Sequence, residues 1–156
     1  MEHAFTIRSG FVAIVGRPNV GKSTFLNRVI GSKISITASR PQTTRDRILG
    51  IYDTEDTQII FLDTPGIHEA GKALNQYMVD KALSTLSDAD IAMVMTSPEE
   101  TAEKLSRVMD HVGTSGKDAV LVLNKADLIP EAEREKRLDL LGSVGAFRGA
   151  YAVSSL

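Results

Sequence analysis

The chain has 156 residues, of which 42% are hydrophobic and 24% are charged, and its net charge is −2. This length and composition predict one globular domain over residues 1–156, and the small negative charge argues against nucleic-acid binding through bulk charge. The sequence has no cysteine, no signal-peptide pattern and no long apolar run, which excludes a thiol nucleophile, a cysteine-zinc site and a spanning helix, and predicts a soluble cytoplasmic domain.

Short apolar runs alternate with helical patterns along the chain, which is typical of an α/β domain with a mostly parallel sheet. In chain order, six strands are expected at Phe11–Val15, Arg47–Tyr52, Gln58–Leu62, Ile91–Met95, Ala119–Leu123 and Ala150–Val153. Four helices are expected at Lys22–Ile30, around Leu74–Leu86, from Ser97 to Gly113 and from Pro130 to about Leu141. A doubly wound sheet needs helices on both faces, so a fifth helix is expected after the sixth strand and the chain is interpreted as a fragment.

Three local details of these elements are also expected. The short connection Asp53–Thr57 makes the second and third strands an antiparallel hairpin. Ser97 is expected to cap the third helix, with Glu100 bonding back to the cap. The charged segment Glu131–Arg137 predicts a solvated helix face.

Residues 16–23 match the pattern G-x-x-x-x-G-K-S between a predicted strand and a predicted helix. The two glycines let backbone N–H groups turn toward phosphate oxygens, and the helix start adds its positive end. Lys22 would supply a charge to the β- and γ-phosphates and Ser23 a hydroxyl to Mg²⁺. The alternative is a glycine-rich turn with a surface lysine. The predicted nucleotide contacts here are Asn19, Val20, Gly21, Lys22, Ser23 and Thr24.

Two further segments fit phosphate chemistry. The apolar strand that ends at Asp63 matches the acidic group that holds the Mg²⁺ shell in phosphate-loop enzymes, and Gly66 has no side chain to keep its N–H from a γ-phosphate. In the polar segment 41–45, a threonine would complete Mg²⁺ coordination; the spacing favours Thr44 and leaves Thr43 open. Taken alone, each segment is also compatible with an ordinary turn or loop.

The segment Asn124–Asp127 follows the apolar strand Ala119–Leu123. The carboxylate of Asp127 can accept two parallel hydrogen bonds, which guanine offers and adenine does not. Asn124 would tie this loop to the phosphate loop, and the Lys125 stem would cover the base. After the sixth strand, Ser154 and Ser155 are the last candidates, with the backbone N–H of Ser155 directed at the guanine carbonyl oxygen.

The predicted positions of these segments in the sheet bring them together. The phosphate loop, Asp63, Asn124 and Ser154 each follow an apolar strand. The carboxyl ends of parallel strands lie at one edge of a sheet, which is where open α/β folds bind ligands. The sequence therefore predicts one guanine-nucleotide site.

With these motifs the sequence resembles the G domain of bacterial Era-type GTPases over most of residues 10–156. GRPNVGKST at 16–24 is shared with the Der and MnmE GTPases, whereas KISIT at 33–37, PQTTR at 41–45, DTPGIH at 63–68 and the segment 75–90 point to Era. The resemblance implies a phosphate-loop fold with strand order 2-3-1-4-5-6, one antiparallel edge strand, and switch segments around 32–45 and 66–76. The sequence departs from the family at three points. Thr96 stands where relatives often have Asp, Ser155 stands where Ala is usual, and the fifth helix is missing.

The resemblance also implies hydrolysis of GTP to GDP and phosphate, with Mg²⁺, in a family linked to assembly of the small ribosomal subunit. Full-length Era proteins bind small-subunit ribosomal RNA through a C-terminal KH domain, whose pattern this chain lacks, and work at the membrane-associated cytoplasm.

For hydrolysis, the catalytic candidates are Lys22, Thr44 and Gly66. Ile67 follows the switch glycine where Ras-like enzymes have a water-orienting glutamine, so slow intrinsic turnover is expected. The relatives suggest a K⁺ ion with Asn19 as ligand, and the alternative for Asn19 is a turn residue.

Arg17, Arg40 and Arg45 are candidates for an arginine finger, with solvated or RNA-facing charges as the alternative; His68 is assigned no role. A nucleotide-gated binding module is the second interpretation of the whole chain, and an ATP-dependent enzyme is disfavoured by Asp127.

Overall fold

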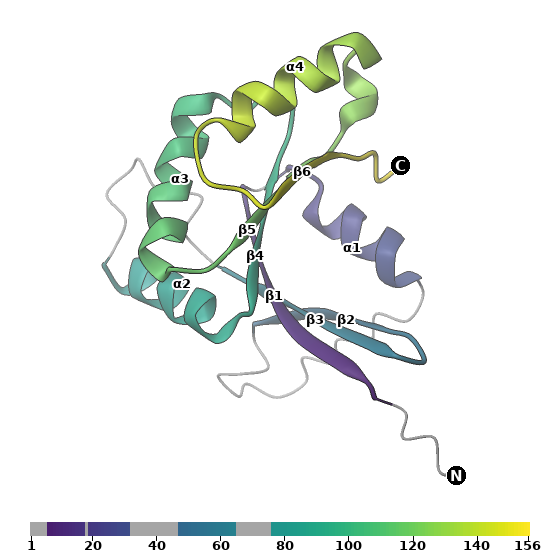
Figure 1. Cartoon of the computed structure of the whole chain (residues 1–156), viewed down its shortest axis with the longest axis vertical. Helices are drawn as coiled ribbons and strands as arrows, with labels where there is room; N and C mark the ends of the chain where they lie inside the picture. The colour runs from purple at the N-terminus through teal and green to yellow at the C-terminus, as the bar shows by residue number, and fades with distance from the viewer. Residues whose placement is uncertain (1–5, 18, 32–46, 65–75) are drawn as a thin grey trace.

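A computed structural model describes residues 6–17, 19–31, 47–64 and 76–156. In this part of the chain, six strands form one sheet in the order β2-β3-β1-β4-β5-β6 (Figure 1). The strands are β1 (Arg8–Gly16), β2 (Ile48–Asp53), β3 (Thr57–Asp63), β4 (Ile91–Thr96), β5 (Ala119–Leu123) and β6 (Gly149–Ala152). The helices are α1 (Lys22–Ile30), α2 (Gln76–Asp88), α3 (Ala102–Ser115), the short 3-10 helix η3 (Ala126–Leu128) and α4 (Glu131–Gly142).

The sheet is parallel except at one edge. β2 pairs antiparallel with β3, whereas β1 pairs in parallel with β3 and β4, and β5 pairs in parallel with β4 and β6. The predicted hairpin, fold class and strand order are therefore confirmed. As a result, the carboxyl ends of β1, β3, β4, β5 and β6 lie at the same edge of the sheet.

Apolar side chains fill both sides of the sheet. On one side, buried residues of α2, α3 and α4 pack on β1, β4 and β5, with Leu86, Leu105 and Leu121 fully or almost fully buried. On the other side, α1 packs Leu26 and Ile30 against β1 and β3. Figure 1 shows α1 on the side of the sheet opposite to α2 and α3. These two layers hold the strands, and hence the edge that carries the candidate site, in place.

The start of α3 differs from the prediction, which placed its cap at Ser97. The helix begins at Ala102, and its cap is Thr101, whose side chain accepts a hydrogen bond of 3.3 Å from the backbone N–H of Lys104. The backbone N–H of Glu100 donates to the Ser97 carbonyl at 3.0 Å, so the residues between them form a separate turn. Glu100 does not bond back to Ser97, because its carboxylate accepts from the Thr96 hydroxyl at 3.3 Å.

The charged segment of α4 is mostly exposed, as predicted, but two of its arginines are partly buried and make specific contacts. Arg137 reaches the loop after β4, where its Nη2 donates to the carbonyls of Pro98 at 2.8 Å and Glu100 at 2.5 Å. Arg134 donates to the carbonyl of Ala126 at 2.8 Å. Two arginines of this helix therefore fix loops at the functional edge of the sheet.

Adjacent leucines on α4 give a matched test of the packing. Leu141 is fully buried, whereas 49% of Leu140 is exposed. We expect Leu141→Ala to lower the free energy of unfolding by about 2–5 kcal/mol, because it removes buried methyl groups and leaves a cavity. Leu140→Ala should change it by about 0.5 kcal/mol or less. Urea unfolding of both variants measures the difference, and equal losses would contradict this packing.

Candidate functional site

The loop after β1 has the backbone shape that the phosphate-loop motif predicts. Asn19 and Gly21 both have positive φ, at 71° and 89°, and α1 begins directly afterwards at Lys22. Gly21 is the N-terminal cap of α1 and provides no side-chain cap. No side chain therefore caps the N–H groups of the first helical turn, which leaves them facing an anion that the helix dipole favours; in the turn before it, the Val20 N–H donates to the Arg17 carbonyl at 3.5 Å.

Lys22 and Asp63 are brought together across the edge of the sheet. The Nζ atom of Lys22 lies 2.9 Å from Oδ1 of Asp63, and 22% and 31% of the two side chains are exposed. The next residue, Thr64, is buried and donates its hydroxyl to the Ile14 carbonyl at 2.8 Å. This contact fixes the end of β3 to β1. The lysine predicted to bind phosphate and the carboxylate predicted to bind the metal therefore lie next to each other.

The oxygen ligands at this place fit Mg²⁺. Ser23 offers a hydroxyl from the exposed first turn of α1, and Asp63 offers a partly exposed carboxylate. No group of three or more His, Cys, Asp or Glu side chains that could hold a metal occurs in the part of the chain that the structure describes. Mg²⁺ is commonly held by one or two protein oxygens together with substrate phosphates and water, so this small set suits it.

Asn124 joins the loop after β5 to the phosphate loop. Its side chain is 1% exposed, and its Nδ2 atom donates to the carbonyls of Val20 at 2.9 Å and Gly21 at 3.3 Å. A Cβ atom on Gly21 would lie 2.4 Å from this Nδ2 atom. Glycine is therefore required at 21 both by its positive φ and by the close approach of Asn124, and the predicted tie between the two loops is present.

The residues after Asn124 form the second half of the site. Lys125 has a positive φ of 58°, and its Nζ atom donates to the Asn19 carbonyl at 2.5 Å, so its stem crosses toward the phosphate loop. Asp127 is exposed, and its Oδ1 atom accepts a hydrogen bond of 2.8 Å from the Ser154 hydroxyl. The carboxylate thus lies beside the segment after β6, as the motif positions predict.

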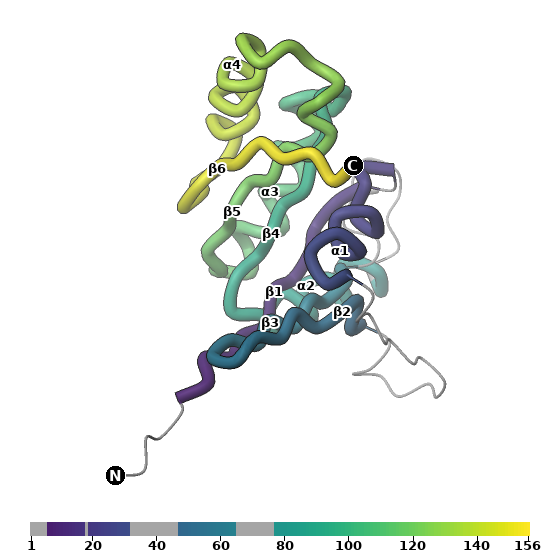
Figure 2. Tube along the Cα trace, turned by 90° about the vertical axis from the view of Figure 1, so that its right-hand side faces the viewer, coloured from purple at the N-terminus to yellow at the C-terminus, as the bar shows by residue number. Residues whose placement is uncertain are grey.

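Ser155 makes a contact that the sequence did not reveal. Its hydroxyl donates to Oδ1 of Asn124 at 2.8 Å, whereas sequence reasoning considered only its backbone N–H. The segment after β6 returns toward the start of α1, as Figure 2 shows. Ser155, Asn124 and the phosphate loop are therefore connected through hydrogen bonds.

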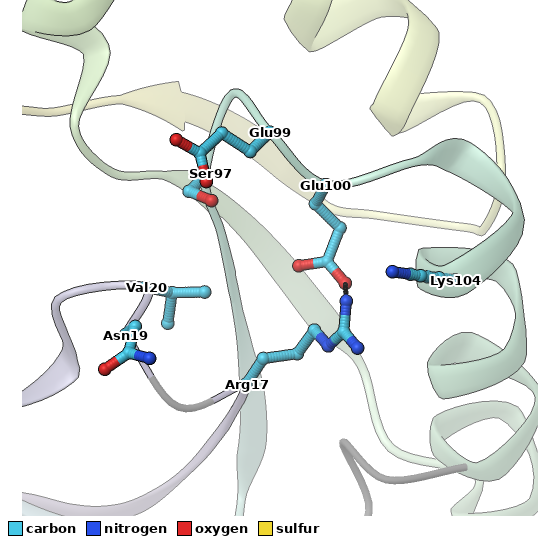
Figure 3. A pocket seen from close by; sticks show the side chains of 7 residues that line it. All are labelled: Arg17, Asn19, Val20, Ser97, Glu99, Glu100 and Lys104. Atoms are coloured by element: carbon cyan, nitrogen blue, oxygen red, sulfur yellow. Dashed lines mark ion pairs between the residues drawn. The ribbon is translucent and has the colours of Figure 1, made fainter. Parts of the chain in front are cut away.

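Glu100 is a second residue that sequence reasoning missed as part of this region. A cavity of about 360 Å³ lies beside the phosphate loop and is lined by Arg17, Asn19, Val20, Ser97, Glu99, Glu100 and Lys104 (Figure 3). Nη1 of Arg17 lies 3.8 Å from Oε1 of Glu100, whose side chain is only 4% exposed. Among the described residues, this Oε1 atom has no hydrogen-bond partner. Arg17 is thus paired with a carboxylate and is not simply solvated.

The charge on Glu100 is disfavoured by its surroundings. Burial raises the pKa of the Glu100 carboxyl, and the charge of Arg17, the hydrogen bond from Thr96 and the charge of Lys104 oppose this rise only in part. The only sequence signal for this arrangement is an acidic residue close to the end of an apolar strand, which is too common to identify a buried one.

Several predicted residues lie outside the described part of the chain. They are the switch candidates Thr43, Thr44, Gly66 and Ile67, together with Arg40, Arg45 and His68.

The fold and the loop after β1 define a phosphate-loop nucleotide-binding domain. Residues 11–125 match the model of the family described as 50S ribosome-binding GTPase, so the chain belongs to this family of GTPases.

Within the family, the chain is similar to proteins named GTPase Era. It is 47% identical over 150 residues to the GTPase Era of Geobacter sp. strain M21, a match that covers 95% of this chain and 50% of that protein. Two Era structures, each 35% identical, cover 96% of this chain and 52% of theirs: an Aquifex aeolicus variant bound to GDP·AlF4⁻, with a TM-score of 0.74, and Era in complex with MgGDPNP and nucleotides 1506–1542 of 16S ribosomal RNA, with a TM-score of 0.71. The chain therefore spans about half the length of these relatives.

The raised pKa of Glu100 predicts a pH-dependent stability. Because the folded protein binds this proton more tightly than the unfolded chain, the contribution of Glu100 to stability is complete below the ordinary carboxyl pKa and is lost as the pH rises through the raised value. We expect the free energy of unfolding of Glu100→Gln to increase relative to that of the parent as the pH rises from about 4 to 8, because the variant has no carboxylate to ionise in the buried position.

Urea unfolding at several pH values measures this difference. Glu135→Gln, which removes an exposed carboxylate from α4, controls for the loss of one negative charge. A Glu100→Gln difference that stays constant with pH would contradict the burial argument.

Proposed function

We propose that this chain binds guanine nucleotides and hydrolyses GTP to GDP and phosphate as a conformational switch. The observation that carries the proposal is the pair of hydrogen bonds from Asn124 to the Val20 and Gly21 carbonyls, because they hold the loop proposed to bind the base beside the loop proposed to bind the phosphates. Membership of the GTPase family and the similarity to an Era structure bound to GDP·AlF4⁻ support it.

Guanine would be selected by Asp127. Its carboxylate accepts two parallel hydrogen bonds, from the ring N1–H and the exocyclic amino group of guanine, whereas adenine would leave it unpaired. The Ser154 hydroxyl already lies 2.8 Å from Oδ1 of Asp127, which orients the carboxylate. The stem of Lys125 would cover one face of the base, and the backbone N–H of Ser155 would donate to the guanine carbonyl oxygen.

The phosphates would be held at the start of α1. The N–H groups of residues 19–24 and the Lys22 ammonium would neutralise their charge, with Lys22 exchanging its ion pair with Asp63 for a phosphate oxygen. Ser23, Asp63 and Thr44, with Thr43 as the alternative to Thr44, would hold Mg²⁺. When bound, Mg²⁺ supplies positive charge against the β- and γ-phosphates.

Hydrolysis would depend on Lys22, Thr44 and Gly66. Lys22 stabilises charge on the transferred phosphoryl group, and the Gly66 N–H donates to the γ-phosphate. Contacts to the γ-phosphate would order the segments that contain Thr44 and Gly66, and loss of phosphate would release them. Ile67 follows the switch glycine and can neither donate nor accept a hydrogen bond through its side chain, so intrinsic turnover is slow.

The role of the whole protein is part of the same proposal. Residues 1–156 would be the G domain of a longer Era-type protein that acts in small-subunit ribosome assembly, in the cytoplasm and at the periphery of the membrane, through a C-terminal KH domain. An Era structure in complex with 16S ribosomal RNA supports the RNA partner. Among the described residues, no helix combines the length and apolar character that a membrane span needs.

Titration of the chain with GTP, GDP and ATP in KCl and Mg²⁺ tests the proposal. We expect GTP and GDP to bind and ATP to bind at least roughly 10⁴-fold more weakly, because adenine leaves the Asp127 carboxylate unpaired. Asp127→Asn should shift the preference toward xanthine nucleotides, because an amide can donate to the xanthine carbonyl that replaces the amino group.

Asp139→Asn, which removes a carboxylate from α4 away from the site, is the matched control and should keep the guanine preference. Equal affinity for GTP and ATP would sink the guanine assignment.

A monovalent cation at Asn19 is a further part of the proposal. The Asn19 side chain lies at the exposed phosphate loop (Figure 3), where its amide oxygen would bind K⁺ and help neutralise charge in the transition state. We expect GTP hydrolysis to be faster in KCl than in NaCl, and Asn19→Ala to abolish this difference. Phosphate release measured in both salts decides between this role and a turn residue: rates that are equal in both salts, and equal for the parent and Asn19→Ala, exclude the ion.

A further inference from the structure

We propose that Ser155 is a positioning residue that sets how tightly the nucleotide is held. Its hydroxyl holds the Asn124 amide in place between the base loop and the phosphate loop. The proposal rests on the proposed binding of guanine nucleotides. It concerns the Ser155 side chain, which is distinct from the backbone N–H directed at the base.

Both ends of the Asn124 amide are engaged. The Nδ2 atom donates to the Val20 carbonyl at 2.9 Å and the Gly21 carbonyl at 3.3 Å, and the Oδ1 atom accepts from the Ser155 hydroxyl at 2.8 Å. The side chain is 1% exposed, so water cannot readily replace a lost partner. An unpaired buried polar atom costs more free energy than the hydrogen bond itself contributes.

The carbonyls of Val20 and Gly21 select one orientation of the amide, because rotation by 180° would place Oδ1 against them, where oxygen faces oxygen. A hydroxyl can donate or accept, so Ser155 does not choose between the two orientations; its hydroxyl satisfies Oδ1 in the orientation that the carbonyls select. Ser155 thereby holds the amide in place while its two donor hydrogens are directed at the phosphate loop, and this contact holds the two halves of the site together.

The same contact holds the segment after β6, which carries the backbone N–H proposed to bind the base. Backbone hydrogen bonds hold this segment as far as Val153, which pairs with Leu123 at 2.8 Å and Ala126 at 3.0 Å. Beyond Val153, the hydroxyls of Ser154 and Ser155 continue the attachment, to Asp127 and Asn124 respectively. One hydroxyl therefore positions both the Asn124 amide and the backbone N–H of its own residue.

The release of a fluorescent GDP analogue from the parent, Ser155→Ala and Ser155→Thr tests the proposal. We expect Ser155→Ala to release it about tenfold faster, because the buried Oδ1 loses its partner. Ser155→Thr retains the hydroxyl and should release it at close to the parent rate. Ser143→Ala removes another serine hydroxyl, which bonds the Leu140 carbonyl at the end of α4, and should leave release unchanged.

A second measurement separates positioning of the phosphate loop from a local change at the base. GDP and GMP share the base and differ by one phosphate. If Ser155 acts through Asn124, Ser155→Ala should weaken the binding of GDP more than the binding of GMP. The affinity for GDP divided by the affinity for GMP should therefore be lower in the variant than in the parent. An equal loss for both nucleotides would confine Ser155 to the base pocket and overturn the proposal.

The outcomes also separate this inference from the proposed function. A parent chain that binds neither GDP nor GTP overturns both. A parent chain that binds GDP, with Ser155→Ala releasing it at the parent rate, overturns only the role of the Ser155 hydroxyl. Circular dichroism of Ser155→Ala checks that the fold is retained, and Ser155→Cys, with a weak S–H donor, should give an intermediate release rate if the hydrogen bond is responsible.

Discussion

The buried amide of Asn124 is the contact on which the rest of the site depends. β1 and β5 are not neighbours in the sheet, because β4 lies between them, so main-chain pairing alone does not hold the loops that follow them together. The Nδ2 atom of Asn124 crosses this gap to the carbonyls of Val20 and Gly21. Because a polar group inside a protein must be hydrogen-bonded, the two loops keep a fixed separation, which a ligand with a base at one end and phosphates at the other requires.

Neighbouring strands reinforce this arrangement from both sides. The backbone N–H of Asn124 donates to the Thr96 carbonyl at 2.9 Å, which joins the end of β5 to the end of β4. On the opposite side of β1, the Thr64 hydroxyl donates to the Ile14 carbonyl, which fixes the end of β3. The functional edge is thus a series of strand ends connected by short hydrogen bonds, and the parallel register brings their loops to the same place.

The strands, the helices and the motifs that directly follow a strand could be predicted from short segments of the sequence. The phosphate loop, Asp63 and the segment Asn124–Asp127 follow apolar strands directly, so strand direction alone placed them at one edge. The contacts of Glu100, Arg137 and the Ser155 hydroxyl join segments far apart in the chain, and no local pattern encodes them. For the same reason the prediction of Ser97 as a helix cap is wrong: its spacing to Glu100 fits a capping box, but the Thr96 hydroxyl donates to the Glu100 carboxylate instead.

Charge balance explains why a buried carboxylate is tolerated beside a loop that is suited to anions. A negative Glu100 with no cation nearby would repel phosphate and would carry the full cost of burial. Arg17, from the phosphate loop itself, extends toward Glu100 and lies 3.8 Å from its Oε1 atom. Arg137 of α4 holds the backbone carbonyl of the same glutamate. The position of Glu100 is therefore set by Arg137 of α4, and its charge is offset by Arg17 of the phosphate loop. The packing of α4 thus bears directly on the electrostatics of the site.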